Sequence, residues 1–168
     1  MKKIIIFEDS LENTVAYVNK LYTIPLVSGV YILLYCVDTK TSDEKIQELS
    51  GKFSRKTPVE KVTLWDYEEK LDTFYAQPNT LFLFDMNLYG DGSTVFDNRI
   101  NVMYARKKMN TEHSVHPRIW FYTTTKAEQR AVLLEKFPDC TLNVQNVVKD
   151  GVLLKFDSRF MEALEAMV

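Results

Sequence analysis

In this 168-residue chain, the side chain placed best for catalysis or ligand binding is an aspartate carboxylate that directly follows an apolar run. Asp85 comes after Leu81–Phe84 and precedes a short loop that contains Asn87, Gly90 and Gly92. A continuous apolar run closed by turn residues is typical of a strand buried on both faces. In a parallel sheet flanked by helices, ligands bind at the carboxyl ends of the strands. We therefore interpret Asp85 as a site residue and not as a residue that packing requires.

Other apolar runs deliver polar groups to the same predicted edge of the sheet. The first run, Lys3–Phe7, ends at Glu8 and Asp9; a later run ends at Thr123, and the last one leads to Lys149. Three carboxylates that meet without a partner raise one another's pKa, and a bound hard cation removes this repulsion. Because Mg²⁺ prefers oxygen ligands, we expect a magnesium site here, with Lys149 and the Thr123 hydroxyl left to hold an anion.

These side chains can meet only if strands alternate with helices along the chain. Apolar runs predict the buried strands, and apolar stripes that follow a Ser, Thr or Asp predict amphipathic helices. We expect strands at 3–7, 31–37, 59–65, 81–85, 118–122 and 143–148, and helices at 10–22, 42–53, 66–76, 95–109, 125–137 and from 157 onward. This order predicts a doubly wound, parallel α/β sheet with right-handed crossovers.

Local spacing also gives expectations for particular side chains. Asp66 and Glu69 have the spacing of a capping box at the start of a helix. Trp65 and Trp120 are expected in the hydrophobic core, and Met103 is expected on the inward face of its helix.

The composition fits one globular domain, with 46% apolar and 26% charged residues. The net charge of −2 and the lack of a basic tail give no support for nucleic-acid binding. No apolar run approaches the ~20 residues of a membrane span, and the first run is too short for a signal peptide. The two cysteines, Cys36 and Cys140, do not make a disulfide framework. We therefore expect a soluble cytoplasmic protein that does not act at a membrane.

The ordered set of motifs resembles the receiver domain of bacterial two-component response regulators. IIIFEDS resembles that family's first strand with its acidic pair, and LFLFDMNLYGDGS resembles its phospho-acceptor strand and loop. PRIWFYT and NVVK resemble its fourth and fifth strands. The resemblance implies a flavodoxin-like or CheY-like three-layer sandwich, in which residues 1–168 form one receiver-like domain with an inserted strand–helix unit at about 25–57.

The resemblance also implies roles for individual residues. Asp85 would accept a phosphoryl group from a histidine kinase, Thr123 would be the switch hydroxyl and Lys149 the pocket lysine. The expected magnesium ligands are Glu8, Asp9, Asp85 and the backbone carbonyl of Asn87. The chain would then regulate a signalling partner rather than act as an enzyme, and both a monomer and a homodimer are compatible with this role.

Several positions depart from the receiver pattern. Tyr89 and Asp150 stand where the family has prolines, and Asn146 replaces the switch aromatic. Thr124 stands where the family has a small residue, and Lys155 competes for the role of pocket lysine.

These departures leave two alternative functions open. The first is a degenerate receiver that is not phosphorylated and only binds a partner protein. The second is a Mg²⁺-dependent enzyme that processes phosphates with a Toprim-like arrangement of acids. That arrangement expects Asp-x-Asp, whereas this chain has Asp85 and Asn87 at the corresponding spacing.

Overall fold

The computed structural model describes residues 2–35, 42–85, 99–112, 118–123, 143–146, 156 and 158–166. Within these ranges six strands form one sheet in the order β3-β2-β1-β4-β5-β6, and all paired neighbours run parallel. The strands are β1 (Lys2–Glu8), β2 (Val27–Tyr35), β3 (Val59–Val62), β4 (Thr80–Asp85), β5 (Ile119–Thr123) and β6 (Asn143–Asn146). The helices are the 3-10 turn η1 (Leu11–Thr14), α1 (Val15–Leu21), α2 (Asp43–Ser50), α3 (Tyr67–Tyr75), α4 (Arg99–Glu112) and α6 (Ser158–Ala166).

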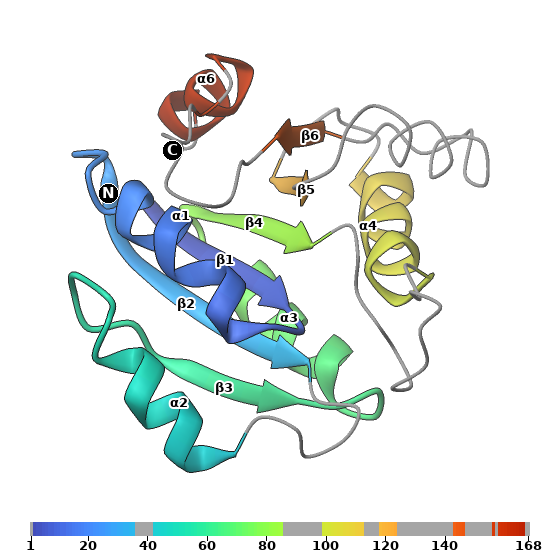
Figure 1. The fold of residues 1–168 in the computed structure, drawn as a ribbon. Helices are drawn as coiled ribbons and strands as arrows, with labels where there is room; N and C mark the ends of the chain where they lie inside the picture. The colour runs from blue at the N-terminus through green and yellow to red at the C-terminus, as the bar shows by residue number, and fades with distance from the viewer. Residues whose placement is uncertain are drawn as a thin grey trace.

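Helices cover both faces of the sheet, which confirms the predicted doubly wound α/β arrangement. Because side chains along a strand alternate between the two faces, the sheet has two separate hydrophobic cores. The core that holds α1, α2 and α6 includes Ile4, Ile6, Ile32, Leu83, Val18, Leu49 and Phe160. The core that holds α3 and α4 includes Ile5, Phe7, Phe84, Phe121, Leu71 and Tyr104. Figure 1 shows α1 in front of the sheet and α3 behind it.

The strand order reverses between β1 and β4, which are neighbours at the centre of the sheet. The chain builds outward from β1 to β3, and then returns through α3 to place β4 on the other side of β1. The helix that follows β1 and the helix that follows β4 therefore pack on opposite faces. In doubly wound proteins such a switch point is where ligands bind, at the carboxyl ends of the strands.

The segment at about 25–57 contains β2 and α2. β2 lies between β1 and β3 and pairs with both, so this segment supplies an inner strand and not an edge. Its description as an insertion stays a prediction.

Some element boundaries differ from the sequence-based expectations. β2 begins at Val27 and runs through Gly29, because pairing with β1 from Lys2 onward overrides the local turn signal of the glycine. β3 ends at Val62, three residues early, and α4 continues to Glu112. The helix expected at 125–137, Cys36 and Cys140 lie outside the described residues.

Three side-chain expectations are wrong and one is confirmed. Trp120 is buried, but Trp65 is 92% exposed because β3 ends before it and the chain turns. Met103 is exposed because the buried stripe of α4 runs through positions 100, 104 and 105, on the other side of the helix. The side chain of Asp66 does not cap α3, since it accepts hydrogen bonds from Thr63 instead.

Among the residues that the structure describes, no helix has both the length and the apolar character needed to cross a bilayer.

Arg118 ties the start of β4, the strand that ends in Asp85, to the end of α3. Its guanidinium donates to the Thr80 carbonyl at 3.1 Å, to the Tyr75 carbonyl at 2.9 Å and to the Gln77 carbonyl at 3.1 Å. It also stacks 4.2 Å from the centre of the Tyr75 ring.

We predict that Arg118→Met lowers the free energy of unfolding by about 2 kcal/mol, because carbonyls that are partly buried lose a charged donor. Urea denaturation measures this effect. The matched control is Lys56→Met, at an exposed position, which we expect to change stability by less than about 0.5 kcal/mol. Equal stability of the two variants would show that the guanidinium does not stabilise the contact between the start of β4 and the end of α3.

Candidate functional site

The ends of β1 and β4 bring two carboxylates together. The two strands pair in register from Lys3 opposite Thr80 to Phe7 opposite Phe84, and the next residues along them are Glu8 and Asp85. Neighbouring strands lie about 4.8 Å apart, so side chains at the same level of two strands are close. One carboxylate oxygen each from Glu8, Asp9 and Asp85 lies within 4.8 Å of the other two. The structure thus brings together three residues that the sequence places at one edge.

Glu8 is the innermost of these residues and is 1% exposed. Its Oε1 accepts hydrogen bonds from the backbone N–H groups of Asp9 and Ser10, each at 3.0 Å. The carboxyl group therefore holds the turn that follows β1, which fixes the direction in which the chain enters η1.

Two buried tyrosines complete the surroundings of Glu8. The Tyr122 hydroxyl donates a hydrogen bond to Glu8 Oε2. The Tyr17 hydroxyl donates to the Tyr122 hydroxyl oxygen at 2.6 Å, and its distance to Glu8 Oε2 is 3.3 Å. Tyr17 comes from α1 and Tyr122 from β5, and their ring centres are 4.9 Å apart. Both oxygens of Glu8 are therefore hydrogen-bonded by groups of this chain.

Burial raises the pKa of Glu8 well above its usual range, and the nearby Asp85 carboxylate raises it further. Burial also raises the pKa of Tyr17 and of Tyr122, and the charge of Glu8 adds to both effects. The cluster consequently favours a proton on Glu8 and neutral tyrosines when no cation is present. A cation that displaced this proton would meet oxygen donors from three carboxyl groups.

A hydrogen bond to the backbone carbonyl of Asp85 holds this residue in place. The side-chain amide of Asn101, a fully buried residue of α4, donates to the Asp85 carbonyl at 2.5 Å. This contact fixes the end of β4 against α4 and leaves the Asp85 side chain at the site, where it is 9% exposed. A partly exposed carboxylate beside a buried acid can serve as a metal ligand or as a nucleophile.

The remaining predicted site residues are placed in part or not at all. Thr123 ends β5, so its backbone lies at the same edge of the sheet, while its side chain is not described. Asn87, Lys149 and Lys155 lie outside the described residues. Their proposed roles stay predictions.

The roles of Tyr17, Tyr122 and Asn101 at the site were not among the sequence-based predictions. The sequence signal for Tyr122 is its position at the carboxyl end of the strand expected at 118–122. In the structure Tyr122 lies opposite Asp85 on the neighbouring strand. A polar residue on the buried side of a predicted helix is the corresponding signal for Asn101. Tyr17 could not be distinguished from an ordinary core residue of α1.

Comparison with known proteins adds no identification: no family model, curated protein or solved structure matches the chain. The geometry of the acidic cluster therefore carries the functional argument.

Glu8 makes stability depend on pH when no metal is added. Its raised pKa means that the folded protein keeps a proton that the unfolded chain has already lost. Stability contributed by this proton is present below the ordinary glutamate pKa of about 4.5 and is lost as pH rises toward the raised value. We predict that in EDTA at pH 8 Glu8→Gln is more stable than the wild type by on the order of 1 kcal/mol, as measured by urea denaturation.

The matched control is Glu12→Gln, because Glu12 is exposed and hydrogen bonding to Lys45 lowers its pKa. We expect no gain in stability at pH 8 for this variant. If Glu8→Gln were less stable than the wild type at pH 8 and equally so at pH 5, the Glu8 carboxyl would not carry the proton.

Proposed function

We propose that this chain is a receiver-like signalling domain that accepts a phosphoryl group on Asp85 from a histidine kinase, with Mg²⁺, and thereby regulates a partner protein. The observation that carries the proposal is the cluster of Glu8, Asp9 and Asp85, in which one oxygen of each carboxylate lies within 4.8 Å of the other two. The cluster lies at the switch point of a doubly wound sheet. The resemblance of the strand-end motifs to those of receivers supports the same conclusion.

The strand order gives further support. If the unit at about 25–57 is an insertion, omission of β2 from the observed order leaves β3-β1-β4-β5-β6. This is the 2-1-3-4-5 order of flavodoxin-like proteins, with the acidic cluster between the first and third strands of that order. The helices fit as well, since α1 and α6 cover one face while α3 and α4 cover the other.

The donor set fits Mg²⁺, which prefers oxygen ligands and commonly takes one or two carboxylates together with water and phosphate. The proposed ligands are Glu8, Asp9, Asp85 and the backbone carbonyl of Asn87. Mg²⁺ at this place would neutralise charge on the phosphoryl oxygens.

In the proposed reaction, an Asp85 carboxylate oxygen attacks the phosphorus of a phosphohistidine. A P–O bond forms, the P–N bond breaks, and its electron pair stays on the imidazole nitrogen, which takes up a proton from solvent. Positioning and charge neutralisation contribute most of the catalysis in phosphoryl transfer. The proposed contributions of this chain are the Thr123 hydroxyl and the Lys149 amine, which would bind phosphoryl oxygens.

We predict that beryllofluoride with Mg²⁺, an acyl-phosphate mimic, shifts the amide resonances near Asp85 in the wild type. Asp85→Asn should abolish the shifts because the carboxylate oxygen that binds beryllium is gone. Asp43→Asn, at an exposed carboxylate outside the cluster, is the matched control and should leave them unchanged. An unaltered wild-type spectrum would remove the phospho-acceptor function.

One observation favours a second candidate, the degenerate receiver that binds a partner without being phosphorylated. Both oxygens of Glu8 already accept hydrogen bonds from this chain, and burial raises its pKa, which favours the protonated carboxyl group when no cation is present. For this function a partner should bind the wild type and Asp85→Ala equally. A strict dependence on Asp85 would count against it.

A further inference from the structure

Two consecutive large hydrophobic residues are exposed in the turn between β3 and α3. Trp65 is 92% exposed and Leu64 is 51% exposed. Their neighbours serve the core instead, since Val62 is fully buried and Tyr67 stacks on Phe7 with 5.9 Å between ring centres. The fold thus buries little of the Trp65 side chain and about half of Leu64, although a tryptophan offers more apolar area than most residues to a binding partner. We refer to residues 63–66 as the Trp65 turn.

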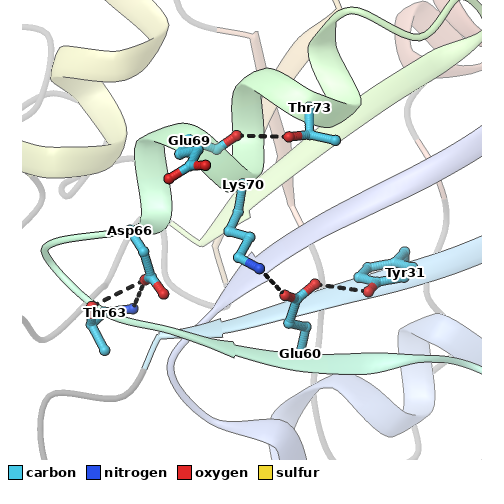
Figure 2. Close-up of polar contacts among 7 residues, drawn as sticks. All are labelled: Tyr31, Glu60, Thr63, Asp66, Glu69, Lys70 and Thr73. Carbon is cyan, nitrogen blue, oxygen red and sulfur yellow. Dashed lines mark hydrogen bonds and ion pairs between the residues drawn. The ribbon is translucent and has the colours of Figure 1, made fainter.

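Hydrogen bonds hold the backbone of the Trp65 turn in one shape. Asp66 Oδ1 accepts from the backbone N–H of Thr63 at 2.6 Å and from its hydroxyl at 3.0 Å, as Figure 2 shows. The Thr63 hydroxyl in turn accepts from the Trp65 N–H at 3.2 Å. Because the turn is already ordered, a partner that binds it pays little conformational entropy.

The base of the turn is tied to the sheet as well. Lys70 of α3 forms an ion pair with Glu60 of β3 at 2.5 Å, and the Tyr31 hydroxyl of β2 donates to the same carboxylate at 2.9 Å (Figure 2). Hydrogen bonding to Lys70 lowers the pKa of Glu60, which keeps this carboxylate charged at neutral pH. Two strands and a helix therefore support the exposed pair.

The surroundings of the turn are acidic. Lys61 of β3 pairs with Asp43 at 2.8 Å, which places the start of α2 beside the end of β3. The acidic residues in and next to the turn and at this helix start are Asp43, Glu44, Glu60, Asp66, Glu68 and Glu69. The lysines there are Lys45, Lys61, Lys70 and Lys107, and each of them forms an ion pair with a carboxylate of this chain. A negative rim attracts a positively charged partner and disfavours anionic lipid and nucleic acid.

The turn is separate from the carboxylate cluster. β3 is two strands away from β1, which corresponds to about 10 Å across the sheet. We therefore expect a ligand to bind the turn without Mg²⁺ and without phosphorylation of Asp85.

We propose that the Trp65 turn is a docking site for a basic segment of another protein, in which an apolar patch receives Trp65 and Leu64 while Lys or Arg side chains face the acidic rim. A central aromatic anchor with a charged rim is the usual arrangement of a protein interface.

The test is a selection of random 16-residue peptides displayed on phage against the full chain in EDTA, with removal of peptides that also bind Trp65→Ser. We expect the recovered peptides to be rich in Lys or Arg and to contain large apolar residues. For synthetic copies, fluorescence anisotropy should show Kd at least tenfold weaker for Trp65→Ser and several-fold weaker for Glu69→Lys. Binding should also weaken as salt is added.

The matched control is Met103→Ser, because Met103 is also an exposed large hydrophobic residue but lies on α4. It should leave Kd unchanged, and equal urea midpoints for all variants would show that the fold is intact. The proposal is overturned if no peptide distinguishes wild type from Trp65→Ser, if the selected peptides are acidic or uncharged, or if Met103→Ser weakens binding equally. Trp65-dependent binding to vesicles of phosphatidylcholine and phosphatidylserine, without peptide binding, would assign the turn to a membrane and would also overturn it.

Discussion

The constraint on which the site depends is the parallel pairing of β1 with β4. Five residues of each strand pair in register, and the strands are almost completely buried. This pairing leaves Glu8 and Asp85 side by side at the ends of their strands. A one-residue shift would place the apolar side chains of β4 on the wrong faces, so both cores fix the register and, through it, the position of the acids.

Hydrogen bonds within the site reduce the free-energy cost of burying the Glu8 carboxyl group. A buried carboxyl group is strongly disfavoured in its charged form unless hydrogen bonds or an opposite charge compensate for the lost water. Glu8 receives two backbone N–H donors and a tyrosine hydroxyl, while Asp9 and Asp85 are more exposed than Glu8. The same geometry allows two states of the cluster, one with a proton on Glu8 and one with a cation shared among the acids. The proposed function requires the second state.

Much of this arrangement could be predicted from the sequence because parallel sheets have a simple rule. Buried strands appear as apolar runs, and their carboxyl ends share one edge, so Glu8, Asp9 and Asp85 could be placed together before any coordinates. The rule does not specify which strands are neighbours, and the inner position of β2 could not be derived from it. Nor could the roles of Tyr17 and Asn101, since a polar atom on a buried helix face acquires its partner only through tertiary packing. The prediction that Trp65 lies in the core is wrong for a related reason, because hydrophobicity alone predicts burial. In the structure β3 ends at Val62, the Thr63–Asp66 hydrogen bonds form a turn, and Trp65 is exposed there.

If the three carboxylates act as one cation site, as we propose, anomalous diffraction from crystals soaked in Mn²⁺ will locate the ion between them. We expect one strong anomalous peak about 2.1 Å from oxygens of Glu8, Asp9 and Asp85, at the carboxyl ends of β1 and β4. Crystals that show manganese elsewhere, or none at these carboxylates at millimolar Mn²⁺, would contradict it.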